Sequence, residues 1–128
     1  MKILGIGVDV IQNKRIQNLI KNSSFIKRTF SKKEVKFSEV SSNKINFFAK
    51  RFAAKEAFAK SLGTGFRNNL NFKDIEILND KIGKPYYYKS RKIDNIISKR
   101  YKIKNYNLFL SISDEKEYSV AFTILQTK

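Results

Sequence analysis

The sequence RFAAKEAFAKSLGTG spans residues 51–65 and is typical of the second half of a long helix that ends at a glycine. At helical spacing Glu56 shares a face with alanine and phenylalanine side chains, so its carboxylate is not expected to be freely solvated. Such a carboxylate needs a cation or a metal ion as partner, because burying it alone would be costly. The alternative is an exposed Glu56–Lys60 pair one helical turn apart, which would stabilise the helix by only about 0.3–0.5 kcal/mol.

Composition indicates a single domain whose acid–base or metal chemistry cannot use cysteine or histidine. Of the 128 residues 41% are hydrophobic, and 11 Phe with 6 Tyr supply bulky packing groups, so we expect one domain over residues 1–128. The chain has no cysteine and no histidine, which excludes disulfides and thiolate metal sites. Acid–base or metal chemistry must therefore use carboxylates, lysines, hydroxyls or water, and such ligands favour Mg²⁺ over zinc.

The net charge of +16 predicts an anionic partner, which charge alone does not identify. Nucleic acid, an acidic protein, a phosphorylated ligand and an anionic membrane surface all fit. Residues 1–12, MKILGIGVDVIQ, are too short and too polar for a signal peptide or a membrane span. No other segment approaches about 20 apolar residues, so we expect a soluble cytoplasmic protein without a membrane-spanning segment.

Alternating residues over positions 3–11 predict a strand. Glycines in a strand usually mark a bulge or the close approach of another group. We interpret Asp9 as an acid presented at the strand end, on a face without bulk so that a ligand can approach. The alternative is that a helix over residues 45–62 packs on the glycines and Asp9 belongs to a loop. One face would carry Leu4, Ile6, Val8 and Val10, and the other Gly5, Gly7 and Asp9.

The remaining pattern predicts short helices, one long helix and antiparallel strands. Asn13 is interpreted as the N-cap of a first helix, and Ser31 with Glu34 as a capping box. The long helix is expected over residues 44–62, with Gly63 ending it. The fold class is therefore α+β, a mostly antiparallel sheet packed against one long helix plus short helices. We further expect strands over 72–80 and 84–88, a helix over 90–101, and a closing hairpin of YNLFLSIS (106–113) and YSVAFTIL (118–125).

Basic residues alternate with aromatic residues between positions 15 and 30. This arrangement suits docking onto an acidic helix, and the alternative is an ordinary solvated cationic face. The candidate docking residues are Arg15, Lys21, Phe25, Lys27 and Arg28.

Asp9 and Glu56 can converge if the long helix crosses the glycine face of the first strand. Two carboxylates, waters and phosphate oxygens form an ordinary Mg²⁺ shell. Arg51, Lys55 and Lys60 would bind the remaining phosphate charge. The sequence therefore predicts a site for a Mg²⁺-bound pyrophosphate.

The loop GTGFR, residues 63–67, follows the long helix. Two glycines and a basic residue could let backbone N–H groups approach a phosphate. The alternative, which describes most such loops, is a simple helix stop.

Five motifs together resemble one known family. They are GIGVDV (5–10) with Arg15, FFAKRFAAKEAFAKSLGTGF (47–66), FKDIEI (72–77), GKPYY (83–87) and LSIS…KEYSVAF (110–122). In this order and over nearly the whole chain, the sequence resembles the holo-acyl-carrier-protein synthase family, the small 4′-phosphopantetheinyl transferases.

This resemblance implies an enzyme of fatty acid biosynthesis. It would transfer 4′-phosphopantetheine from coenzyme A to a serine hydroxyl of apo-acyl carrier protein and release adenosine 3′,5′-bisphosphate. Asp9 and Glu56 match the family's Mg²⁺ ligands, and Lys60 matches a lysine close to the reacting phosphate. Glu56 and Lys60 are therefore the expected catalytic residues.

The resemblance also implies binding surfaces and an assembly. Arg15 and the basic residues after it match the surface that docks the acidic carrier protein. Family members are homotrimers with active sites at subunit interfaces. The coenzyme A site is expected to include Arg51, Lys55, Gly63, Thr64, Gly65, Lys84, Pro85 and Ser111.

One part of the family pattern is absent. The family usually has two histidines around the closing hairpin, and this chain has Phe109 and Asp114 at those positions. The first histidine tends to lie near the 3′-phosphate of coenzyme A, so the change affects that contact.

Two other functions are alternatives. A non-catalytic carrier-protein binder would explain the missing histidines but has no need of Asp9, Glu56 and Lys60 together. A small basic nucleic-acid-binding protein would explain the charge, but no RNA-binding signature is present in the sequence, and carboxylates near phosphates are unhelpful without a metal. We therefore expect no nucleic-acid partner.

Overall fold

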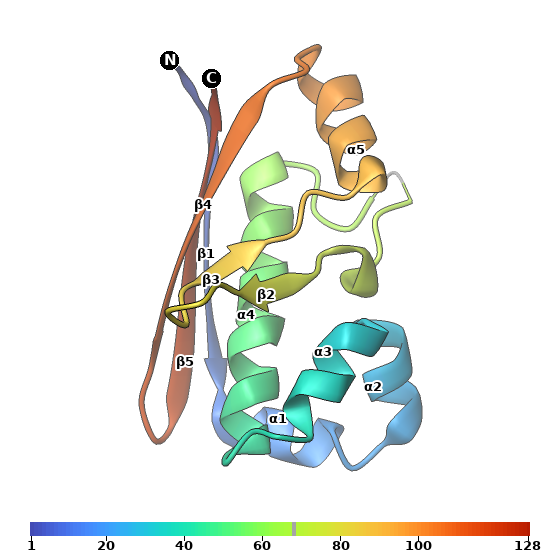
Figure 1. Cartoon of the computed structure of the whole chain (residues 1–128), viewed down its shortest axis with the longest axis vertical. Coiled ribbons are helices and arrows are strands. Elements are labelled where there is room, and N and C mark those ends of the chain that lie inside the picture. The colour runs from blue at the N-terminus through green and yellow to red at the C-terminus, as the bar shows by residue number, and fades with distance from the viewer. Residues whose placement is uncertain (68) are drawn as a thin grey trace.

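A three-stranded antiparallel sheet with one long helix beside it forms the centre of the molecule (Figure 1). The structure is a computed structural model that describes residues 1–67 and 69–128. The sheet has the order β1-β5-β4, and a second sheet pairs β2 with β3. The strands are β1 (Ile3–Gln12), β2 (Ile77–Asn79), β3 (Pro85–Tyr87), β4 (Tyr106–Asp114) and β5 (Tyr118–Thr127).

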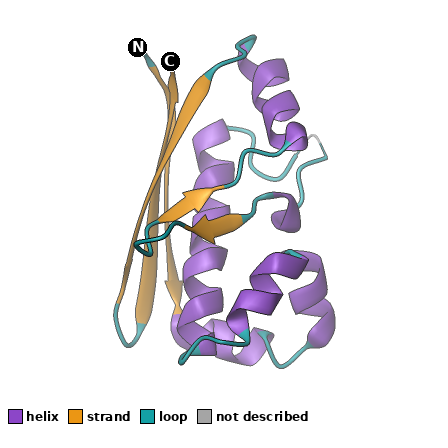
Figure 2. Cartoon of the chain, viewed as in Figure 1, coloured by secondary structure: helices purple, strands orange, loops and turns teal. Residues whose placement is uncertain are grey.

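The helices lie along one side of this sheet (Figure 2). They are α1 (Asn13–Leu19), α2 (Ser23–Thr29), α3 (Lys32–Ser38), α4 (Lys44–Leu62) and α5 (Arg91–Tyr101), with a 3₁₀ turn, η1, at Phe72–Asp74. The expected α+β fold, with one long helix against an antiparallel sheet, is confirmed. No helix within the described residues is both long and apolar enough to cross a membrane.

The long helix has the predicted bounds because both of its ends are capped. The side chain of Asn43 accepts a hydrogen bond from the Asn46 N–H at the first turn. At the other end Gly63 adopts a left-handed conformation, with φ of 77°, and its N–H donates to the Lys60 carbonyl. Alanines and phenylalanines of α4 fill the core between these caps.

Gly5 and Gly7 let the backbone of α4 lie directly on β1. A Cβ on Gly5 would lie 1.8 Å from the Ser61 carbonyl oxygen, and a Cβ on Gly7 would lie 1.9 Å from that of Ala57. The bare glycine face therefore accommodates the helix rather than a ligand, as the alternative interpretation held. Asp9, however, lies within the strand and not in a loop.

Two local predictions are wrong because of contacts between distant residues. Asn13 is the first residue of α1 rather than its cap, and its buried amide donates to the Glu115 and Lys116 carbonyls in the β4–β5 turn. The strand expected over residues 72–80 is confined to β2. Its first part turns instead, because the carbonyls of Phe72 and Ile75 accept hydrogen bonds from Lys55.

Candidate functional site

Asp9, Glu56 and Lys60 come together where α4 crosses β1. Asp9 lies on the helix side of the sheet, paired with Ala121 of β5. The ammonium of Lys60 lies 3.1 Å from Asp9 Oδ1 and 3.0 Å from the Val8 carbonyl oxygen. Glu56 is half-buried one helical turn before Lys60. The predicted convergence of the strand acid with the helix residues is thus present.

The pKa of Glu56 is shifted by burial and by the charges of Asp9, Lys60 and Arg15. Burial first, and then the negative charge of Asp9, raise the pKa of the Glu56 carboxyl above its ordinary value. The positive charges of Lys60 and Arg15 partly offset this rise. Arg15, which sequence reasoning assigned only to docking, therefore also belongs to the electrostatic environment of this site.

Asp9 and Glu56 suit a magnesium ion that is shared with a ligand better than a structural metal ion held by protein side chains alone. Two neighbouring carboxylates destabilise each other's charge, and a divalent cation between them would relieve this. Within the described residues no group of three or more His, Cys, Asp or Glu could hold a metal. Mg²⁺ is commonly held by one or two carboxylates while waters and substrate phosphates complete its octahedral shell. The two oxygen donors therefore suit an ion that arrives with a phosphorylated ligand.

The side chain of Lys55 lies in the core, so the prediction that it binds coenzyme A is corrected. Its side chain is 0% exposed, and its ammonium lies 2.7 Å from the equally buried Glu34 carboxylate. It also donates to the carbonyls of Phe72 and Ile75. With its hydrogen bonds directed into the core, Lys55 joins α3 and residues 72–75 to α4 and does not reach a ligand.

Arg51 also points away from Glu56 and Lys60, as its position on the helix requires. The guanidinium donates to Asn79 Oδ1 at 2.6 Å and lies 3.6 Å above the Phe47 ring. Burial lowers the pKa of Arg51 to about 10, and the charge of Glu34 opposes this shift. Because Asn79 pairs with Pro85, Arg51 lies beside the β2–β3 hairpin that carries Lys84 and Pro85.

The loop after α4 is mainly a helix stop. The N–H of Gly63 donates to the Lys60 carbonyl and that of Gly65 to the Ala59 carbonyl, so neither amide is directed at a phosphate. Thr64 instead lines a cavity of about 640 Å³. The other residues of that cavity are Leu62, Asn69, Ile96, Lys99 and Arg100.

The hairpin residues lie on two sides of the sheet. Ser111 aligns with Phe122, which aligns with Val8, and this row lies on the face away from α4. Phe109 is on that same outer face and is half-exposed. Asp114 lies on the helix side, where its carboxylate accepts a hydrogen bond from the Asn46 amide at 3.0 Å.

The candidate docking residues are exposed except for one. Arg15, Lys21, Lys27 and Arg28 are solvent-exposed on α1, α2 and the connection between them. Phe25 is only 6% exposed, because its ring packs against Phe30 and Phe52 in the core. The prediction that Phe25 is presented for docking is therefore corrected, although Arg28 stacks on its ring.

Comparison with known proteins identifies similar chains along the whole length. A family model, that of the 4′-phosphopantetheinyl transferase superfamily, matches residues 5–123. The holo-[acyl-carrier-protein] synthase of Pelagibacter ubique is 59% identical over 128 residues, which cover all of both chains. That of Clostridium tetani is 47% identical over 130 residues, covering 97% of this chain and 96% of the relative.

Solved structures of holo-[acyl-carrier-protein] synthases superpose closely on this chain. The holo-[acyl-carrier-protein] synthase of Neisseria meningitidis matches with a TM-score of 0.88 and 35% identity, over 98% of this chain and 99% of that one. The structure from Bacillus anthracis, in complex with coenzyme A (3′,5′-ADP), matches over 100% of both chains with a TM-score of 0.82 and 33% identity.

Proposed function

The chain belongs to the 4′-phosphopantetheinyl transferase superfamily, and from this premise we propose that it catalyses the reaction of the holo-[acyl-carrier-protein] synthases it resembles. It transfers 4′-phosphopantetheine from coenzyme A to a serine hydroxyl of apo-acyl carrier protein. The serine oxygen forms a bond to the phosphorus that carries pantetheine, and the bond from that phosphorus to adenosine 3′,5′-bisphosphate breaks. The observation that carries the proposal is the cluster of Asp9, Glu56 and Lys60 on β1 and α4.

The charged groups of this cluster suit phosphoryl-type transfer, which depends mainly on positioning and charge stabilisation. Asp9 and Glu56 would hold Mg²⁺, which when bound neutralises charge on the pyrophosphate. Lys60 is half-exposed and within hydrogen-bond distance of Asp9, so its ammonium lies at the mouth of the site. It would orient a phosphate oxygen beside the attacking serine.

We propose that coenzyme A binds between subunits of a homotrimer. Apart from the buried Lys55, the candidate coenzyme A residues fall into three separate groups in one chain. They are Arg51 with Lys84 and Pro85 at the β2–β3 hairpin, the loop 63–65 after α4, and Ser111 on the outer sheet face. Contact between chains would bring such groups together, and it would place Phe109 at the same interface.

The outer face of the large sheet supports this assembly. Its exposed side chains are largely apolar on β1 and β5, and the row of Ile6, Ile124 and Phe109 extends the apolar surface onto β4. An apolar surface of this kind marks an interaction site when it is contiguous. The large members that are 40–59% exposed in one chain include Ile6, Val8, Val10, Phe109, Tyr118 and Phe122.

The basic charge of the chain supports an acidic carrier protein as the second substrate. Arg15 contributes to the electrostatics of Glu56 and is exposed on α1, so a carrier bound there would lie close to the site. Opposite charges would speed the encounter of enzyme and carrier, and added salt would reduce this gain. We place the reaction in the cytoplasm, in the supply of holo-carrier for fatty acid biosynthesis.

The proposal is tested by following the nucleotide product. The protein is incubated with coenzyme A, Mg²⁺ and an apo-acyl carrier protein, and adenosine 3′,5′-bisphosphate is quantified by chromatography. The proposal expects release that requires the carrier and stops when its serine is replaced by alanine. Carrier binding without any release would instead support the non-catalytic binder.

A further inference from the structure

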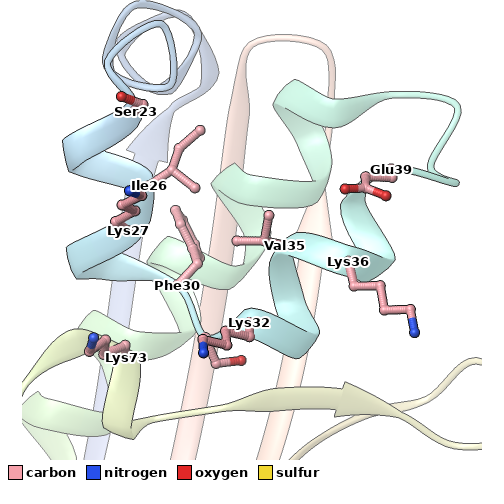
Figure 3. Close-up of a pocket in the computed structure, with 10 residues that line it drawn as sticks. Ser23, Ile26, Lys27, Phe30, Lys32, Val35, Lys36, Glu39 and Lys73 are labelled. Atoms are coloured by element: carbon pink, nitrogen blue, oxygen red, sulfur yellow. The ribbon is translucent and has the colours of Figure 1, made fainter.

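A groove between α2 and α3 lies outside the proposed catalytic site. It encloses about 560 Å³, a volume typical of small-molecule sites. Figure 3 shows Ile26 and Phe30 from one side and Val35 from the other pointing toward one another across its floor. The Phe30 ring packs against Phe48 of α4, whereas Ile26 and Val35 are half-buried and reach the surface. The floor of the groove is therefore apolar and rests on the long helix.

The two ends of this groove differ in charge. Lys32 is the first residue of α3, and Figure 3 shows Lys73 of η1 on the same side of the groove. The 3₁₀ turn reaches this end because the buried Lys55 bonds both to the first turn of α3 and to the Phe72 carbonyl. Glu39, the single acid among the lining residues, lies about 10 Å farther along α3. The end of the groove at which α3 begins is thus positive.

Four exposed lysines surround the apolar floor. They are Lys27, Lys32, Lys36 and Lys73. None of the ion pairs among residues 1–67 and 69–128 includes any of them. A single solvated lysine would not indicate a ligand. Four of them around an apolar floor, however, match a molecule with an apolar chain and an anionic group, because the chain would cover the floor and the anion would lie among the ammonium groups.

We infer that this groove binds a long-chain carboxylic acid. The alkyl chain lies on Ile26, Phe30 and Val35, and the carboxylate lies at the end that carries Lys32 and Lys73. Each methylene that the ligand buries completely raises its affinity about fourfold. A sugar phosphate would pair with the lysines but leave the floor exposed, and an uncharged lipid would leave the charges unused. The site is separate from the proposed catalytic cluster, and binding to it does not depend on phosphopantetheine transfer.

The length and the charge of the ligand test this inference. Isothermal titration calorimetry follows the binding of octanoate, decanoate and dodecanoate to the wild-type chain, each below its critical micelle concentration and without coenzyme A or carrier protein. We expect one ligand per chain and a dissociation constant that falls about fivefold for each two added methylenes, since an open groove buries them in part. Decanol, which lacks the charge, should bind at least about tenfold more weakly than decanoate.

Two double variants separate the groove from the general charge of the protein. Lys32→Gln/Lys73→Gln removes two charges at the positive end of the groove. Lys102→Gln/Lys104→Gln is the matched control, because it removes two exposed charges beyond α5. The dissociation constant of dodecanoate should rise about tenfold in the groove variant and less than about twofold in the control.

A third variant tests the floor. Val35→Gln keeps the charge of the protein and places an amide where the alkyl chain should lie. It should raise the dissociation constant of dodecanoate about fivefold and weaken the dependence of affinity on chain length. Thermal unfolding monitored by circular dichroism shows whether each variant is folded.

Three results would overturn the inference. They are the absence of dodecanoate binding to the wild type, equal affinities of the two double variants, and binding of several dodecanoate molecules per chain at equivalent sites. Groove-dependent binding to phosphatidylglycerol vesicles without binding of the free acids would also overturn it and assign the groove to a membrane surface. Failure of the transfer assay would reject the proposed function and leave these titrations unchanged.

Discussion

Gly7 and Ala57 are in such close contact that a methyl group on Gly7 would lie 1.9 Å from the Ala57 carbonyl oxygen. The backbones of β1 and α4 therefore touch at this point. Two residues after Gly7 the strand presents Asp9, and one residue before Ala57 the helix presents Glu56. This contact and the one between Gly5 and Ser61 fix the depth of the helix on the sheet and bring the two carboxylates of the candidate site together.

Replacing Gly7 by alanine should separate the helix from the strand. We expect Gly7→Ala to lower the free energy of unfolding by about 2–4 kcal/mol, because the added carbon meets backbone that no rotamer change can move. Gly83→Ala is the matched control, since a Cβ there has open space and only its φ of 89° is unfavourable, at a cost of about 1 kcal/mol. Denaturant unfolding measures both. Equal stability of the two variants would contradict the close contact.

Removing the charge of Glu56 should separate activity from stability. Glu56→Gln is expected to lower the transfer rate at least about 100-fold, because the site loses a metal ligand and its negative charge. The pKa of Glu56 is raised in the folded chain, so its charged form is disfavoured there. The variant should therefore melt at a higher temperature than the wild type at neutral pH.

The sign of this effect reverses the usual behaviour of a paired carboxylate. The stability contributed by a carboxyl with a raised pKa is complete below its ordinary value of 4.5 and is lost as pH rises through its folded pKa. The stabilisation by Glu56→Gln should accordingly vanish below pH 4.5. Glu117→Gln, in the exposed β4–β5 turn, is the control and should leave both activity and melting temperature unchanged. A fully active Glu56→Gln would remove Glu56 from the site.

The buried pair of Glu34 and Lys55 should be important for stability. Glu34→Ala leaves the Lys55 ammonium buried without its carboxylate and removes the capping-box partner of Ser31, so we expect a loss of about 3–5 kcal/mol. Lys92→Met breaks the partly exposed pair with Asp74 and should cost less than about 1 kcal/mol. Denaturant unfolding measures the free energy of unfolding of both variants. Similar losses would show that the buried Glu34–Lys55 pair stabilises the fold no more than the partly exposed Lys92–Asp74 pair does.

The helix that carries the site could be predicted because its signals are local. Asn43 caps the first turn of α4, Gly63 ends it, and the glycines of β1 indicate where another element approaches. The orientations of Lys55 and Phe25 could not be predicted in the same way. Both depend on α2, α3 and residues 72–75 packing on α4, and these contacts join residues 17 or more positions apart.

The same limit explains the errors at Asn13 and at residues 72–76. An asparagine between a strand and a helix has the local pattern of a cap, but here its side chain holds a turn more than 100 residues away. The carbonyls of Phe72 and Ile75 bond to Lys55 instead of a neighbouring strand. The alternation of apolar and polar residues over 72–80 does not reveal that these carbonyls accept hydrogen bonds from Lys55.

The proposed assembly predicts that one charge on the outer sheet face dissociates the protein. Val8→Asp places a carboxylate among apolar side chains of β1 and β5, and burying it between subunits would be costly. We expect a trimer for the wild type and a monomer with strongly reduced transfer for the variant, by analytical ultracentrifugation and activity. Val40→Asp changes an 85% exposed residue outside this face and should alter neither property. A wild-type monomer with full activity would reject the intersubunit site.

The most direct test of the central claim is the intact mass of an apo-acyl carrier protein after incubation with this protein and coenzyme A, with Mg²⁺ or with EDTA. We expect a Mg²⁺-dependent gain of one phosphopantetheine per carrier, which is absent with EDTA and with Glu56→Gln. No mass gain on any of several apo-carriers, from a folded wild-type protein, would contradict the assignment of Asp9, Glu56 and Lys60 to phosphopantetheine transfer.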